Sequence, residues 1–161
     1  MARKIFLWLM LAGWLVVGEN GFAIDKNKLP KMVSLKWHEV NVRKGPGKRF
    51  PIAFILKERG VPLKLIRRHG DWREIVDWQG SKGWILRSAL SDKSTLIIHV
   101  DETDMMSKPH RSSSDRGRLI AKLKKGVTAE VITCDKKWCR VETFIGKRQG
   151  WIRKMDSRIE F

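Results

Sequence analysis

The sequence predicts an all-β chain that contains two small barrels in tandem. Short apolar segments alternate with glycine-containing turns, a pattern typical of many short strands. The clearest turn is Gly45-Pro46-Gly47, where proline fixes φ and the glycines can adopt conformations that other residues avoid. Much of this pattern occurs a second time downstream, which indicates a duplicated unit. A barrel also removes the exposed edges that such strands would otherwise have.

The duplication is visible at eight positions that recur in the same order, seven of them with the same residue and most of them 66 positions further on. Chance does not readily produce such a series, so we expect one barrel at 33–91, a second at 96–157, and a junction at Ser91–Thr95. The recurring pairs are Gly60-Val61 and Gly126-Val127, Ile66 and Ile132, Trp72 and Trp138, Ile75 and Val141, and Gly83-Trp84-Ile85 and Gly150-Trp151-Ile152 after a one-residue insertion.

Residues 1–23 are predicted to be a secretory signal peptide. Arg3-Lys4 precedes an apolar run over 5–18, and Gly21-Phe22-Ala23 places small residues at the −3 and −1 positions of a cleavage site. The run is 14 residues long, shorter than the roughly 20 that span a bilayer as a helix. We expect cleavage after Ala23 and export to the periplasm or the exterior. An uncleaved membrane anchor is the alternative, and a membrane is a partner only in that case.

Each repeat is predicted to consist of short strands after a flexible lead-in at 24–32. The second repeat opens with a strand at Leu96–Val100, and Asp101–Arg118 is predicted to be a long polar loop. The strands expected in the first repeat are Val33–Trp37, Val40–Arg43, Ile52–Leu56, Val61–Ile66, Trp72–Trp78 and Lys82–Leu86.

Cys134 and Cys139 flank four residues, with strand-like sequence on both sides. That spacing can place the two thiols opposite one another across a hairpin, within disulfide distance. An exported chain meets an oxidising compartment, which favours the bond. Two free thiols are the alternative. A metal site is disfavoured because no second Cys/His pair lies at ligand spacing, and no cofactor is expected.

The motifs of the first repeat are Asn41-Val42-Arg43, Gly45-Pro46-Gly47, Gly60, Gly70-x-Trp72 and Gly83-Trp84. This series resembles the bacterial SH3-like (SH3b) domain family, over 33–91 specifically and over 96–157 through fewer motifs. A signal peptide followed by two such domains is similar to small exported proteins of Gram-negative bacteria. The resemblance implies SH3-like barrels of five to seven strands, a non-enzymatic binding role and association with cell-wall peptidoglycan or its stem peptides.

Four aromatic side chains and one arginine are the candidate ligand contacts: Trp37, Arg43, Phe50, Trp78 and Trp84. Trp78 lies next to a hairpin tip, where an exposed indole can serve as a ligand platform, and Phe144 stands at the same offset in the second repeat. Arg43 can form a bidentate pair with a carboxylate.

Each candidate also has a structural alternative. Trp84 can cap the barrel, since tryptophan buries a large area, and the other three aromatic residues can clamp a hairpin or fill the small core. For Arg43 the alternative is an ion pair inside the domain, with Glu39 or Asp77.

Composition and charge restrict the function further. The formal charge is +17, so an anionic partner is plausible, and the main site is expected in the first repeat, where 31–91 carries 14 basic and 5 acidic residues. The acidic residues of 71–77 next to Arg67, Arg68 and Arg73 read as a solvated, salt-bridged face. The four histidines are scattered, and no nucleophile, base and orienter occur together, so we expect no enzymatic activity.

The hypothesis with most support is therefore an exported, non-enzymatic module that binds a cell-envelope ligand, with peptidoglycan favoured. One alternative is an adaptor that docks an envelope protein. The other is an electrostatic binder of nucleic acid or anionic surfaces, and an exported chain has few nucleic acids to meet. The chain has no tyrosine, so a tyrosine-lined groove for polyproline peptides is excluded.

Overall fold

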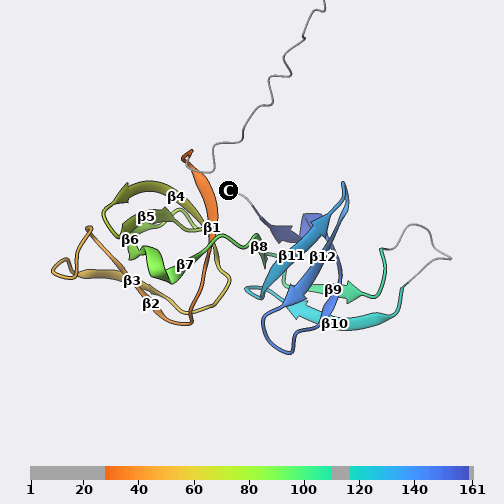
Figure 1. Cartoon of the computed structure of the whole chain (residues 1–161). Coiled ribbons are helices and arrows are strands. Elements are labelled where there is room, and N and C mark those ends of the chain that lie inside the picture. The colour runs from red at the N-terminus through yellow and green to blue at the C-terminus, as the bar shows by residue number, and fades with distance from the viewer. Residues whose placement is uncertain (1–27, 110–116, 160–161) are drawn as a thin grey trace, which may run out of the picture.

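A computed structural model describes residues 28–109 and 117–159 and confirms the all-β class and the tandem barrels (Figure 1). Two antiparallel sheets of seven strands each curl into small barrels, which we call barrel 1 (31–91) and barrel 2 (95–158). The predicted signal peptide with its predicted cleavage site at Ala23, and the first part of the 24–32 lead-in, lie outside the described residues. The domain limits read from the sequence stay predictions.

Barrel 1 follows the strands expected from the alternating apolar pattern, with one short strand added after a 3₁₀ turn. Its sheet order is β3-β2-β6-β5-β4-β1-β7. The elements are β1 (Lys31–Leu35), β2 (Val40–Arg43), β3 (Ile52–Leu56), β4 (Pro62–His69), β5 (Trp72–Val76), β6 (Lys82–Leu86), η1 (Arg87–Ala89) and β7 (Leu90–Ser91).

Barrel 2 repeats this topology strand for strand, in the order β10-β9-β13-β12-β11-β8-β14. The described helical residues form only the two 3₁₀ turns, and none of them makes a helix long and apolar enough to cross a membrane. The elements are β8 (Thr95–Ile98), β9 (Glu102–Met106), β10 (Leu119–Lys124), β11 (Thr128–Cys134), β12 (Trp138–Thr143), β13 (Gln149–Arg153), η2 (Lys154–Asp156) and β14 (Ser157–Arg158).

Strand β9 corrects the sequence prediction of a long polar loop over 101–118. The strand pairs with β10 along five registered positions and meets β13 where Met106 faces Trp151. Thr103 and Met105 are buried while their neighbours Glu102 and Asp104 are exposed. Inward and outward side chains do alternate in this segment. The alternation was hard to recognise because threonine and acidic residues make the segment polar, and only Met105 supplies a strongly apolar inward side chain.

Backbone hydrogen bonds also recur in the two barrels. Gly60 N donates to Leu35 O at 2.8 Å, and Gly126 N donates to Ile98 O at 2.9 Å, each from a glycine with a φ above +80°. Each 3₁₀ turn is held by an equivalent hydrogen bond in its barrel. A backbone amide of the 3₁₀ turn donates to a carbonyl oxygen in the turn between the fourth and fifth strands. The repeat seen in the sequence is therefore also a repeat of the backbone hydrogen bonding.

Each barrel has its own apolar core. The core of barrel 1 is built from the inward side chains of its strands, and that of barrel 2 from their counterparts. The fully buried members include Leu35, Leu63, Ile75, Ile85 and Val42 in barrel 1, and Leu96, Ile98, Met105, Val141 and Ile152 in barrel 2.

A glycine stands at a close approach of two neighbouring strands in each barrel. A Cβ on Gly83 of β6 would clash with Val42 Cγ1 and lie 3.0 Å from Arg43 O of β2. A Cβ on Gly150 of β13 would lie 2.5 Å from Met105 Cγ and 3.0 Å from Met106 O of β9. These distances are shorter than ordinary van der Waals contact, so the Gly-Trp pairs of the sequence stand where β6 meets β2 and where β13 meets β9.

The two barrels contact one another directly. The ring of Phe144 packs against the backbone of Gly60, where any Cβ would overlap it. The Arg59 guanidinium lies 5.3 Å from the centroid of that ring, and the buried Thr128 hydroxyl donates to Arg59 O at 2.6 Å. The contact therefore joins the turn before β4 of barrel 1 to β11 and the β12–β13 turn of barrel 2.

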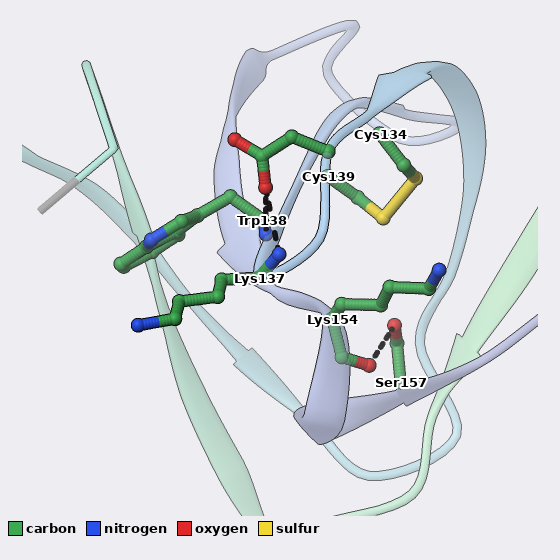
Figure 2. Close-up of a disulfide and its surroundings, with 7 residues drawn as sticks. Cys134, Lys137, Trp138, Cys139, Lys154 and Ser157 are labelled. Atoms are coloured by element: carbon green, nitrogen blue, oxygen red, sulfur yellow. Dashed lines mark hydrogen bonds between the residues drawn. A yellow bond between two sulfur atoms is a disulfide. The ribbon is translucent and has the colours of Figure 1, made fainter. Parts of the chain in front are cut away.

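The disulfide between Cys134 and Cys139 is confirmed (Figure 2). The two residues face one another at the end of the β11–β12 ladder, with their Cα atoms 4.1 Å apart. Asp135 Oδ1 accepts hydrogen bonds from the Lys137 and Trp138 amides at 2.7 Å each, which shapes the tight turn between the cysteines.

Gly60→Ala is expected to detach the barrels, whereas Gly126→Ala is the matched control. Both glycines have positive φ, so either alanine costs about 1–2 kcal/mol of backbone strain. Only the Cβ at Gly60 meets Phe144, since nothing lies within 4 Å of the one at Gly126. NMR relaxation should therefore give separate rotational correlation times for the two barrels in Gly60→Ala and a shared one in Gly126→Ala. Equal behaviour of the two variants would contradict the contact.

Reduction of the disulfide is expected to destabilise barrel 2 by about 2 kcal/mol, because the bond closes a short loop in the unfolded chain. Thermal unfolding with and without a reductant measures the change. Cys134→Ser/Cys139→Ser should reproduce it and should respond no further to the reductant. A loss of stability confined to barrel 1 would show that the account of this bond is wrong.

Candidate binding site

The Gly45-Pro46-Gly47 turn between β2 and β3 is closed by two of the predicted site residues. The ring of Phe50 packs on Gly45, where a Cβ would lie 2.5 Å from its Cδ1 atom. Arg43 Nη1 donates to Phe50 O at 2.8 Å, so the partner of this arginine is a backbone carbonyl in its own turn. The Arg49 guanidinium lies 5.4 Å from the centroid of the Phe50 ring. Arg43 and Phe50 thus hold the turn in shape.

Trp84 lies beside this turn, opposite Arg43 in the ladder between β2 and β6. Its side chain is 8% exposed, and the ring of His69 meets it edge-on with centroids 6.4 Å apart. The structure therefore brings Arg43, Phe50 and Trp84 to one end of barrel 1. Their roles toward a ligand stay predictions.

The other two predicted residues lie elsewhere. Trp37 is 54% exposed and donates from Nε1 to Ser88 O of η1 at 3.3 Å, with the Lys36 ammonium 4.8 Å from its ring centroid. Trp78 is half-buried against the core of barrel 1. Trp37 is thus the one member of the predicted set with a largely open indole face.

A cleft of about 650 Å³ lies between the barrels, next to the Phe144 contact. Barrel 2 contributes most of its apolar lining, and cationic side chains come from both barrels. The residues that line it are His38, Glu58 and Arg59 of barrel 1, and Ala121, Leu123, Lys125, Gly126, Val127, Thr128, Thr143, Phe144, Ile145, Gly146 and Arg148 of barrel 2.

Thr143 fixes the β12–β13 turn that presents the aromatic wall of this cleft. Its hydroxyl donates to Ile145 O at 2.8 Å and accepts from the Arg148 amide at 3.2 Å. The turn then leaves Ile145 84% exposed. Two positive φ values, at Gly146 and Lys147, complete the reversal of the chain.

The charge of the cleft is mainly positive. Arg59, Lys125 and Arg148 line it together with one carboxylate, that of Glu58, and with His38. Apolar side chains surrounded by guanidinium and ammonium groups suit a ligand with small aliphatic parts and carboxylates. Among the described residues, no group of three or more His, Cys, Asp or Glu side chains lies close enough to hold a metal ion.

Sequence reasoning did not find this cleft, because its walls come from two domains. The sequence places Phe144 at the position that corresponds to Trp78, and this correspondence is the signal from which the cleft could have been found. In barrel 1 the indole of Trp78 packs against the core of that barrel. In barrel 2 the ring of Phe144 instead packs on Gly60 of barrel 1.

The chain is similar to a curated bacterial protein over part of its length. Putative N-acetylmuramoyl-L-alanine amidase YrvJ of Bacillus subtilis is 27% identical over 121 residues, which cover 71% of this chain and 23% of that protein. The chain thus spans about a quarter of the curated relative it matches.

Two solved structures are similar at low identity. NlpC2 from Trichomonas vaginalis has a TM-score of 0.34 and 13% identity, over 81% of this chain and 48% of the other. An NlpC/P60 family protein from Bacillus cereus has a TM-score of 0.37 and 11% identity, over 80% of this chain and 56% of the other.

The bacterial SH3 domain family model matches the chain twice, at residues 36–92 and 110–156. The two matches fall on the two barrels and together cover more than half of the sequence. The resemblance seen in the sequence motifs is thereby confirmed, and the chain belongs to the bacterial SH3 domain family.

Proposed function

We propose that the protein is a non-enzymatic binding module of the bacterial cell envelope, and that its ligand is peptidoglycan, held through the stem peptides. The observation that carries this proposal is the cleft between the barrels, where apolar side chains and cations line one hollow. Stem peptides combine small aliphatic side chains with free carboxylates, so both halves of such a ligand find partners there.

The apolar and the cationic side chains of the cleft would contact different parts of the ligand. Ile145, Phe144 and Val127 offer apolar surface for an aliphatic side chain, and covering the exposed Ile145 would remove apolar area from water. Arg59, Lys125 and Arg148 offer charge-assisted hydrogen bonds to carboxylates. The predicted contacts in barrel 1, with Trp37 as the exposed member, would extend the same ligand-binding surface if the glycan chain runs across it.

The relative supports a cell-wall context. Its name describes an amidase for N-acetylmuramoyl-L-alanine, and this chain matches about a quarter of it, within a family of SH3 domains. We infer that the shared part holds the enzyme at its substrate, and that this chain performs a binding step of the same kind. Export through the predicted signal peptide would bring the chain to the wall, and its charge of +17 attracts an anionic polymer.

Ile145→Ser/Lys125→Gln is expected to weaken retention on purified wall sacculi about tenfold or more, because it removes one apolar contact and one cation. Pelleting at increasing protein concentration measures the affinity. Met155→Ser is the control, since Met155 is 75% exposed and does not line the cleft.

The binding should persist at moderate salt, because part of it is apolar contact. Affinity that falls roughly a thousandfold between low and moderate salt would instead indicate the electrostatic alternative. No retention of the unaltered protein on sacculi would refute the proposal, and so would equal retention of the cleft variant and the control. Crosslinking in cells that recovers one envelope protein and no wall fragments would favour the adaptor.

A further inference from the structure

Strand β3 forms one edge of the sheet of barrel 1 (Figure 1). In the part of the chain that the structure describes, β3 pairs with β2 on one side and with no strand on the other. All of its residues are apolar, in the order Ile-Ala-Phe-Ile-Leu. A strand at an edge presents backbone N–H and C=O groups to which a further strand can pair. We call the open side of Ile52–Leu56 the β3 edge.

Two isoleucines of β3 point away from the core. In the ladder with β2, Ile55 faces Asn41 and Ile52 faces Arg43. Asn41 and Arg43 are two positions apart, so their side chains and those of their partners lie on the same face of the sheet. The residue between them, Val42, is fully buried and points to the core. Ile52 and Ile55 therefore lie on the outer face, where they are 46% and 41% exposed.

The corresponding edge of barrel 2 is formed by β10. The two ladders can be aligned at Arg43 and Met106, because each of these residues faces the tryptophan of the Gly-Trp pair in its barrel. In both ladders the register shifts next to that residue. Counted from this shift, Ile55 of β3 corresponds to Lys122 of β10.

Barrel 2 carries charge where barrel 1 carries these apolar side chains. Lys122 faces Asp104, and its ammonium lies 2.6 Å from the carboxylate of Glu102. Charged side chains on an edge strand oppose the addition of a further strand. Barrel 1 instead has Ile55 opposite the uncharged Asn41. The fold is thus compatible with a protected edge, and barrel 1 has one that a further strand can cover.

Cations stand at both ends of the β3 edge. Lys48 and Arg49 precede the strand, Lys57 follows it, and all three are exposed. The next carboxylate along the chain, that of Glu58, lines the cleft between the barrels. A strand with carboxylates at its ends would therefore meet opposite charges on both sides, and apolar side chains between them would cover the two exposed isoleucines.

The same cations oppose the pairing of two copies of this chain along β3. An antiparallel pair of β3 strands would bring Lys48 and Arg49 of each copy beside Lys57 of the other. Like charges that face one another destabilise a strand pair. The occupant that fits the edge is therefore an acidic strand from a different protein.

We propose that the β3 edge takes up an extended, acidic segment of a partner protein as an additional strand. Backbone hydrogen bonds hold the segment, and its alternate side chains determine which segments fit. The β3 residues do not line the cleft between the barrels, so this surface is separate from the site of the proposed function. The two proposals can hold or fail independently.

The probe for this surface is the peptide Asp-Glu-Val-Thr-Val-Thr-Val-Glu-Asp, which has acidic ends and an alternating centre. It is titrated into the isotope-labelled protein, and binding is followed by the amide chemical shifts. Saturable changes are expected at the amides of 40–43 and 52–56, which form β2 and β3. A peptide with lysine in place of each acidic residue should bind about tenfold or more weakly, because it meets like charges.

Two N-methylated forms of the peptide test the backbone pairing without any change in the protein. One form carries the methyl groups on its valine nitrogens and the other on its threonine nitrogens. Alternate residues of an extended strand donate to the same side, so one form should lose about tenfold or more in affinity while the other binds nearly as before.

A pair of matched variants tests the apolar contact. Ile55→Thr should weaken peptide binding about threefold or more, because it removes apolar surface and keeps a β-branched residue in the strand. Ile132→Thr is the control, since Ile132 is 47% exposed on β11 of barrel 2.

The proposal would be overturned by equal binding of the two N-methylated peptides, by equal binding of the acidic and the lysine peptide, or by equal losses in the two variants. Absence of saturable binding would overturn it as well, and so would changes located at the cleft. Shifts of the 52–56 amides that depend on protein concentration without peptide would show instead that a second copy occupies the edge.

Discussion

The close approach of two paired strands at a glycine is the constraint on which both barrels depend. At Gly83 and Gly150 the facing strand approaches so closely that only a residue without a side chain fits. This approach lets β6 pair with β2, and β13 with β9, which bends seven short strands around one small core. A barrel of this size has few inward positions, so each is filled completely: Leu35, Ile75 and Ile85 are at most 1% exposed.

Because the backbone is fixed so tightly, the two copies differ mainly at the ends of their hairpins. The β5–β6 hairpin of barrel 1 turns Trp78 toward its core, and the β12–β13 hairpin of barrel 2 directs Phe144 to Gly60 of the other barrel. The β4–β5 hairpin carries facing arginines, and the β11–β12 hairpin carries a disulfide. Hairpin ends tolerate such exchange because they lie outside the core. In this way a duplicated barrel gains a cleft between the copies.

Much of this fold could be predicted from the sequence, because its signals are local. Turn glycines, alternating valines and the repeat at a spacing of 66 positions predicted the strands and the duplication, and the hairpin spacing of Cys134 and Cys139 predicted their bond. Strand β9 was missed because its inward residues, Thr103 and Met105, lie among acidic ones. The polar residues there obscured the alternation of buried and exposed side chains, which becomes clear only from the pairing with the neighbouring strands.

The candidate sites could be predicted only in part. Arg43, Phe50 and Trp84 are indeed close together, but the arginine contacts a backbone carbonyl rather than the carboxylate of Glu39 or Asp77 that the sequence suggested as its alternative. The cleft needs both barrels, because its lining residues come from each of them. Contacts between segments so far apart in the chain leave no pattern that a single sequence reveals.

Whether ligands bind where the two barrels of shared topology differ is tested most sharply by mapping amide chemical shifts with soluble muropeptides. Saturable changes are expected at Arg59, Lys125 and Ile145, around the cleft, and none at Gly83 or Gly150, which lie where neighbouring strands approach closely. Changes confined to the 44–50 turn of barrel 1, or distributed equally over both barrels, would contradict this expectation.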